Sequence, residues 1–169
     1  TYAGDATKDS LIDGGNGIDY LMLDKTTSTI AVTFSLANPS VDQTADGTIV
    51  RNIEYIDYYG GTGVDTITGG ALADKLYGNG ANDILNAAGG NDQLYGGTGD
   101  DRLTGGAGDD KVDGGEGVDT VVFSGAKSDY DIMNYGSFVQ VRDKRAGGDG
   151  TDQVLNVEKV QFSDGTFDM

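Results

Sequence analysis

Aspartates recur at a fixed spacing along the centre of the chain, and their carboxylates could bind a metal cation. Seven of them stand nine residues apart, namely Asp65, Asp74, Asp83, Asp92, Asp101, Asp110 and Asp119. Carboxylate oxygens are hard ligands that suit Ca²⁺. The chain has no His and no Cys, which excludes Ser-His-Asp and Cys-His catalysis and zinc hydrolase motifs. The spacing therefore predicts a repeated cation site.

An enzymatic role finds little support in the same residues. A glycosidase needs only two carboxylates, but periodic aspartates fit a repeated structural site better than one acid/base pair. No P-loop is present, and the Gly runs lack a βαβ context. Glu54 and Glu158 are candidate catalytic acids without a partner at a recognisable spacing, so a surface or cap salt bridge is favoured for them. We predict that the chain is not an enzyme.

Composition and charge narrow the range of partners. Asp and Glu outnumber Lys and Arg by 28 to 11, a net charge of −17, which argues against nucleic acid or an anionic membrane as partner. The 29 Gly and single Pro indicate a backbone that turns often and keeps its N–H groups for a ladder. No apolar run is long enough for a transmembrane segment, and no N-terminal signal pattern is present. The start at Thr1 suggests a fragment of a longer protein.

Short strands joined by glycine turns must position the aspartates. From Gly60 to Val122 the chain divides into seven consecutive nonapeptides with Asp at position six. Position eight is always aliphatic: Ile67, Leu76, Leu85, Leu94, Leu103, Val112 and Val121. Each Gly-rich half predicts a tight turn, and three residues around position eight predict a strand with the aliphatic pointing inward. Stacked in parallel about 4.8 Å apart, with two nonapeptides per coil, these strands would form one apolar ladder.

Such stacking brings the aspartates of every second repeat together. The predicted pairs are Asp65 with Asp83, Asp74 with Asp92, Asp83 with Asp101, Asp92 with Asp110, and Asp101 with Asp119. Two like charges a few Å apart repel by about 1 kcal/mol even in water. Two carboxylates and the turn carbonyls form an oxygen cage suited to calcium. A Gly-rich disordered linker, or a β-helix whose aspartates merely solvate turns, is the less favoured alternative.

The nonapeptides match G-G-x-G-x-D-x-U-x, so the chain resembles the RTX (repeats-in-toxin) haemolysin-type calcium-binding family. The resemblance implies an all-β, right-handed parallel β-roll in which position-six Asp residues bridge coils. It also implies carbonyl ligands from positions one and three of one turn and two and four of the next. The best-matched site would take Gly96, Thr98 and Asp101 with Gly115, Gly117 and Asp119. The other carbonyl ligands carried over are Gly61, Gly63, Gly78, Gly80, Gly105 and Ala107. Up to about five Ca²⁺ ions are expected in the array.

Some repeats depart from the pattern. Leu72 and Ala81 replace a position-four Gly, and Ala87–Ala88 replaces Gly-Gly. Ala and Leu resist positive φ by about 1 to 2 kcal/mol, whereas Asn79 tolerates it. We expect sites that use these turns to bind more weakly, or one of them to be empty.

A further cassette flanks the repeats and occurs twice, at Gly17–Gly60 and Gly117–Gly165, called here the first and second cassettes. Each begins as a roll turn, continues through alternating strands and returns through an N-[IV]-E-x-[IV] strand, and the copies are expected to differ only by small loop changes. The cassettes resemble the caps that interrupt and terminate β-rolls in exported RTX proteins. Asp9 and Asp19, in looser turns, are weaker candidate ligands. The predicted division is residues 1–59, 60–122 and 123–169.

The resemblance implies a calcium-binding module that folds on meeting extracellular calcium and serves secretion, folding and stability of a larger bacterial protein. It further implies export by the type I secretion machinery and a secreted or cell-surface location. One alternative is an adhesion or polysaccharide-binding module that uses calcium for rigidity, with Tyr20, Tyr55, Tyr58 and Tyr59 as a sugar platform. Another is the C-terminal tail of a secreted protease, lipase or epimerase.

Overall fold

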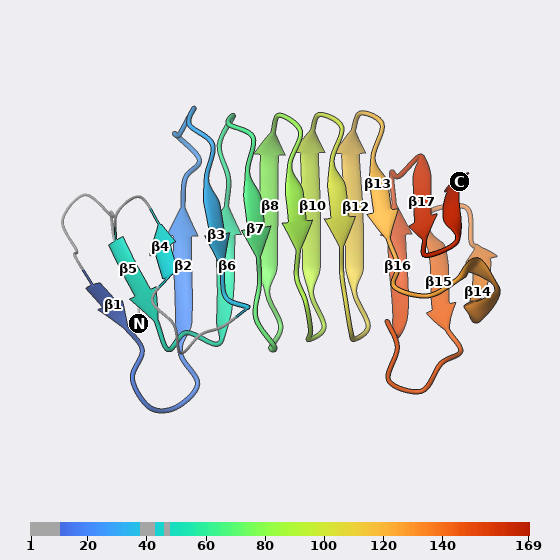
Figure 1. The fold of residues 1–169 in the computed structure, drawn as a ribbon. Coiled ribbons are helices and arrows are strands. Elements are labelled where there is room, and N and C mark those ends of the chain that lie inside the picture. The colour runs from blue at the N-terminus through green and yellow to red at the C-terminus, as the bar shows by residue number, and fades with distance from the viewer. Residues whose placement is uncertain (1–10, 38–42, 46–47) are drawn as a thin grey trace.

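The computed structural model describes residues 11–37, 43–45 and 48–169, which form an all-β roll (Figure 1). Its one helical segment in the described residues is the 3₁₀ turn η1 (Lys127–Asp129). No helix in the described part of the chain is long and apolar enough to cross a membrane. The fold therefore depends on strand stacking.

Two large sheets form the walls of the roll, and a small third sheet lies at the N-terminal end (Figure 1). The eight-stranded sheet contains, in spatial order, β14 (Tyr130–Asn134), β15 (Val139–Asp143), β16 (Thr151–Leu155), β12 (Lys111–Glu116), β10 (Gln93–Thr98), β8 (Lys75–Gly80), β6 (Tyr55–Tyr59) and β2 (Tyr20–Asp24). The seven-stranded sheet contains β18 (Gly165–Asp168), β17 (Lys159–Phe162), β13 (Thr120–Val122), β11 (Arg102–Thr104), β9 (Ile84–Asn86), β7 (Thr66–Thr68) and β3 (Thr33–Ser35). The third sheet contains β1 (Leu11–Asp13), β5 (Thr48–Arg51) and β4 (Gln43–Ala45).

The repeats alternate between the two large sheets in the expected parallel register. Leu76 pairs with Leu94 and Leu94 with Val112 in one sheet. In the other sheet, the aliphatic of every second repeat follows the same rule, in the order Ile67, Leu85, Leu103 and Val121. All seven position-eight side chains are at most 1% exposed. The aliphatic ladder is therefore the core, as the periodicity predicts.

Strands differ in length between the two walls. β7, β9, β11 and β13 have the expected three residues, whereas β8, β10 and β12 have six because pairing continues into the next glycine turn. On the opposite wall this continuation is reduced to an isolated bridge between Gly89 and Ala107. The turns are thus stacked as regularly as the strands.

The ladder extends beyond the repeats in both directions. Tyr58 of β6 pairs with Leu76 and fills a core position, and Phe34 pairs with Ile67. At the other end Val154 pairs with Val112, and Val160 with Val121. Both cassettes therefore add coils to the roll.

The two cassettes share their first and last pairings but differ in the middle. Ile12 pairs with Val50 as Val112 pairs with Val154, and β2 pairs with β6 as β13 pairs with β17. An antiparallel pairing is shared as well, of β4 with β5 and of β15 with β16, but the expectation of small loop changes is wrong for the other middle strand. β3 pairs in parallel with β7, whereas β14 and β15 form an antiparallel hairpin. The physical reason is the place of each cassette in the chain. The first cassette precedes the repeats, so β3 can pair with a repeat strand, whereas the second follows them and its strands pair with each other.

The second cassette covers the C-terminal end of the roll. β15 pairs antiparallel with β16 and β18 with β17, so neither wall ends on a roll strand. Phe123, Tyr130 and Phe162 pack with ring centroids 5.0 to 5.7 Å apart over the end of the core. These contacts close both the strand edges and the apolar end.

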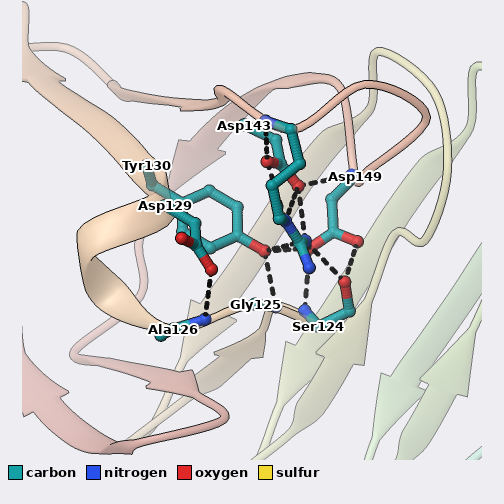
Figure 2. Close-up of polar contacts among 8 residues, drawn as sticks. Ser124, Gly125, Ala126, Asp129, Tyr130, Asp143 and Asp149 are labelled. Atoms are coloured by element: carbon teal, nitrogen blue, oxygen red, sulfur yellow. Dashed lines mark hydrogen bonds and ion pairs between the residues drawn. The ribbon is translucent and has the colours of Figure 1, made fainter.

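A polar network anchors this cap (Figure 2). The Arg145 guanidinium donates to the Asp143 carboxylate, to Ser124 Oγ at 2.8 Å and to the Tyr130 hydroxyl at 2.8 Å. Tyr130 and Ser124 in turn donate to Asp149. The arginine holds the pKa of Asp143 well below its usual value, mainly through these hydrogen bonds. The network fixes the loop that returns the chain to β16.

Candidate calcium site

The position-six aspartates form two stacked rows, one on each edge of the roll. The first row precedes the strands of the seven-stranded sheet and contains Asp65, Asp83, Asp101 and Asp119. The second row precedes the strands of the eight-stranded sheet and contains Asp74, Asp92 and Asp110. All seven are at most 3% exposed. Each predicted pair consists of neighbours within one row.

One oxygen of each stacked carboxylate is used to join coils. Oδ1 of Asp101 accepts the backbone N–H of Asp83 at 2.7 Å, and Oδ1 of Asp119 accepts that of Asp101 at 2.8 Å. The same bond, eighteen residues back, links the other three predicted pairs. Oδ1 of Asp65 accepts the N–H of Val32, and Oδ1 of Asp74 accepts the N–H of Ile56. Val32 and Ile56 occupy the equivalent place in the coil before the repeats. The rows therefore begin with no carboxylate beneath them.

The second oxygen of most of these carboxylates is buried without a hydrogen-bond partner. Among the described residues this holds for Oδ2 of Asp83, Asp92, Asp101, Asp110, Asp119 and Asp19. Asp65 Oδ2 instead accepts from the Tyr58 hydroxyl, and Asp74 Oδ2 from the Gly70 N–H, both at 2.6 Å. A buried carboxylate oxygen with no donor is costly, and a cation is the natural way to satisfy it.

Turn carbonyls converge on these same oxygens. A Cβ at Gly96 would lie 2.2 Å from Asp101 Oδ2 and 2.5 Å from the Gly114 carbonyl oxygen. At Gly78 the corresponding atoms are Asp83 Oδ2 and the Gly96 carbonyl oxygen, at 2.3 and 2.6 Å. A position-one Gly therefore leaves open a space bounded by carboxylate and carbonyl oxygens. This donor set is oxygen alone, which fits Ca²⁺.

Glycines at positions two and four are needed for two reasons. Four of these glycines have φ between +105 and +145, namely Gly97, Gly99, Gly115 and Gly117. A Cβ at Gly115 or Gly117 would also lie 2.1 or 1.9 Å from the carbonyl oxygen of the stacked Gly97 or Gly99. Asn79, Ala81 and Ala88 adopt the same positive-φ conformation at 71°, 79° and 74°. These substituted turns keep the shape of the others, at the cost of strain.

The first two turns have a different shape. Gly61, Gly63, Gly70 and Leu72 are outside the positive-φ region. A Cβ at Gly61 would meet Ser28 O at 2.0 Å, and one at Gly70 would meet Glu54 O at 2.2 Å, so these turns pack on the first cassette. They are also the turns whose aspartates have protein donors for Oδ2. The turns of repeats three to seven therefore fit a cation better.

The remaining predicted ligands lie along the same edges. The structure places Gly61, Gly63, Gly78, Gly80, Gly96, Thr98, Gly105, Ala107, Gly115 and Gly117 in the turns beside the two rows. Asp19 lies in a similar turn of the first cassette, where a Cβ at Gly14 would meet Asn52 O at 2.0 Å. Asp9 lies outside the described residues. Among the described residues no three acidic side chains gather closely enough to hold a metal by themselves, so backbone carbonyls must contribute.

Burial makes these carboxylates hard to ionise. It raises the pKa of Asp83 and of Asp92 to about 7, with smaller contributions from neighbouring aspartates of the row. The pKa values of Asp74, Asp110 and Asp119 rise to about 6 for the same main reason. Burial rather than mutual repulsion is thus the larger electrostatic cost of the stack.

One acidic residue of the rows, Asp152, escaped the sequence analysis, and Glu54 and Glu158 have another role than the one expected. Asp152 Oδ1 accepts the Asp110 N–H at 2.9 Å and so continues the second row. Glu158 Oε2 accepts the Asp119 N–H at 2.8 Å and continues the first, and Glu54 does the same for Asp19. These glutamates make coil-joining hydrogen bonds, whereas the sequence favours a surface or cap salt bridge for them. A signal for Asp152 was present, because residues 147–155 read GGDGTDQVL, a full nonapeptide match.

Comparison with protein families agrees with this geometry. Residues 59–94 and 88–121 match the RTX calcium-binding nonapeptide repeat, a unit of four copies. The central part of the chain, residues 59–121, therefore consists of RTX calcium-binding nonapeptide repeats. RTX nonapeptide repeats bind Ca²⁺ and form a structural module. A search of curated proteins gave no match.

Proposed function

We propose that this chain is a calcium-dependent folding module, ligated by the position-six aspartates and their turn carbonyls, that serves secretion and stability of a larger exported protein. The observation that carries the proposal is the set of buried Oδ2 atoms without hydrogen-bond donors in repeats three to seven. Bound calcium would supply the positive charge and coordination that these oxygens lack. The proposed units remain residues 60–122 for the array and 1–59 and 123–169 for the flanking cassettes.

The physical basis of the switch is the cost of folding without a cation. Each coil of the array buries two carboxylates, and the buried hydrophobic residues of the array are the one aliphatic of each repeat and Ala87. A ligand that binds the folded state alone stabilises it by about 2.7 kcal/mol per site at a hundredfold excess over Kd. Several such sites together are comparable to the whole stability margin of a domain, about 5 to 15 kcal/mol. At cytosolic calcium the chain would stay loose, which suits export through a type I secretion system, and it would fold outside the cell.

Ion counting tests this proposal directly. Native mass spectrometry of calcium-stripped protein, titrated with Ca²⁺, should show about five bound ions, one for each unpartnered Oδ2 of the array. Mg²⁺ at the same concentrations serves as the control and should bind few or none, because it demands a tighter octahedral shell. Equal uptake of the two ions, or no uptake of calcium, would contradict the proposal.

The aromatic residues give the polysaccharide alternative little support. Tyr58 is fully buried and cannot contact a sugar. Tyr59, Tyr77 and Tyr95 stack on one another with centroids 5.0 and 4.6 Å apart and interplanar angles of 8° and 5°. Stacked rings cover each other's faces, whereas sugars pack on exposed faces. Calcium-dependent folding is therefore the function that the geometry supports best.

A further inference from the structure

We infer that the loop Gly147–Asp152 of the second cassette is an eighth calcium-binding turn, which holds an ion together with the turn Gly105–Asp110. The inference rests on the proposed function and deepens it, because it names Asp152, outside the contiguous repeats, as the second carboxylate for the ion counted at Asp110 Oδ2. The two turns are joined in space although 36 residues separate Asp110 from Gly147 in the sequence. The site would fasten the C-terminal cap to the roll.

The loop reproduces the repeat's stacking at four successive positions. At position three, Asp149 O accepts the Gly108 N–H, as Glu116 O accepts the Gly99 N–H. At position four, a Cβ at Gly150 would lie 2.1 Å from Gly108 O, as one at Gly117 would lie 1.9 Å from Gly99 O. Gly150 has φ of +89, in the same region as its counterparts.

Positions five and six continue the match. The Thr151 N–H donates to Asp109 Oδ1 at 2.8 Å, as the Val118 N–H donates to Asp100 Oδ1 at 2.9 Å. The Asp110 N–H donates to Asp152 Oδ1 at 2.9 Å, as the Asp101 N–H donates to Asp119 Oδ1 at 2.8 Å. β16 then pairs with β12 as the next roll strand. The chain has therefore returned to the repeat register before Asp152.

An unsatisfied oxygen points to the ligand. Asp110 is 3% exposed, and its Oδ2 has no hydrogen-bond partner. This atom would lie 2.1 Å from a Cβ at Gly105, as Asp101 Oδ2 would lie 2.2 Å from a Cβ at Gly96. Asp152, itself 3% exposed, supplies the second carboxylate. The first two positions of the loop depart from the repeat, because Gly148 packs on the Asp143 carboxylate.

The cap network connects this site to the rest of the cassette. Figure 2 shows Asp149 facing Ser124 and Tyr130, and its backbone N–H donates to Asp143 Oδ2 at 2.8 Å. Asp143 N–H donates to Gly150 O at 2.8 Å. A cation at Asp152 would thus order the loop that Arg145 holds, and with it the hairpin of β14 and β15.

The test compares Asp152→Asn with Asp168→Asn in the full chain. An Asn at 152 keeps an oxygen for the Asp110 N–H but loses the charge, and Asp168 is an exposed acid of the same cassette. Native mass spectrometry at saturating calcium should find one ion fewer in Asp152→Asn and the wild-type number in Asp168→Asn. Hydrogen exchange on the wild type should show residues 147–155 gaining protection at the calcium concentration that protects residues 96–104.

Each result decides the matter. An unchanged ion count in a folded Asp152→Asn variant overturns the inference and leaves the proposed function standing. If that variant does not fold, exchange on the wild type decides, and protection of 147–155 in calcium-free buffer overturns the inference. A wild type that binds no calcium overturns the proposed function as well.

Discussion

Each aspartate of the rows divides two tasks between its two oxygens. Oδ1 accepts a backbone N–H from the preceding coil, and Oδ2 in repeats three to seven faces the turn without a donor. An amide could perform the first task but not the second, because it carries no charge. This division explains why position six is always Asp while position five varies among Asn, Asp, Val and Ala.

Asp101→Asn should therefore have opposite effects with and without calcium. In saturating calcium we expect a loss of about 2 to 3 kcal/mol in the free energy of unfolding, because the sites on both sides of Asp101 weaken. In calcium-free buffer we expect higher stability than wild type, since the variant no longer buries a charge. Denaturant unfolding in both buffers measures the two effects.

Asp100→Asn is the matched control for this variant. Asp100 is exposed at position five and accepts the Val118 N–H, and the equivalent Asn82 already accepts the Asp100 N–H with an amide. The control should stay close to wild type in both buffers. Equal losses in the two variants would contradict the division of tasks.

The raised pKa values of the rows predict how stability depends on pH. The folded-state pKa of Asp83 and of Asp92 is about 7, above the ordinary 3.8, so the folded state holds more protons between these values. In calcium-free buffer the contribution of these groups is fully present below pH 3.8 and is lost as pH rises through about 7. Calcium-stripped protein should hence show more β-structure by circular dichroism at pH 4.5 than at pH 7.5.

Calcium reverses this dependence, because protons and calcium compete for the same carboxylates. The apparent affinity for calcium should fall as pH decreases below 7. Calorimetric titrations at pH 5.5 and 7.5 measure this change. A stripped protein that gains structure as pH rises, or an affinity unaffected by pH, would contradict the burial of ionisable Oδ2 atoms.

At the scale of elements, the glycine turns are constrained both by their dihedral angles and by the carbonyls stacked beneath them. Two substitutions separate these constraints. Gly115→Ala violates both constraints, because φ is +105 and the new Cβ would lie 2.1 Å from Gly97 O. Gly136→Ala violates only the constraint on the dihedral angle, because φ is +86 and nothing lies within 4 Å of the new Cβ.

We expect Gly136→Ala to cost about 1 to 2 kcal/mol, the price of positive φ alone. Gly115→Ala should cost about 2 to 5 kcal/mol, because overpacking adds about 1 to 3 kcal/mol. Denaturant unfolding in saturating calcium measures both. Equal losses would show that stacking of turn carbonyls places no demand on position two.

The elements that could be predicted from the sequence are those governed by the nine-residue period. The position-eight ladder and the stacking of position-six aspartates both follow from it, and the structure has the expected neighbours. Asp152 was missed because its nonapeptide stands out of frame with the array, after a hairpin whose length the period does not determine. The place of Glu158 in the first row was missed because only three residues, Asn156–Glu158, form the turn that has six residues in the repeats. Asn156 in this turn has φ of +46.

The first coils were also beyond reach of the pattern. The polysaccharide alternative would place Tyr58 at the surface, but its pairing with Leu76 places it in the core with its hydroxyl on Asp65. That register is set by how the first cassette enters the roll. The sequence does not determine this register, because strands with alternating apolar and polar residues can pair in more than one register.

At the scale of the whole molecule, the net charge of −17 and the stacked buried carboxylates oppose folding, while the aliphatic ladder favours it. We propose that bound calcium decides between these opposing contributions to the free energy of folding. Because every coil stacks on its neighbours, binding in one turn favours order in the next, so folding should be cooperative in calcium.

Far-UV circular dichroism of calcium-stripped protein during a calcium titration at pH 7.5, with magnesium as the control, tests this claim most directly. We expect a largely unordered spectrum at first, and a steep cooperative change to β-structure with calcium but not with magnesium. A spectrum already rich in β-structure without calcium, and unchanged by its addition, would contradict the account.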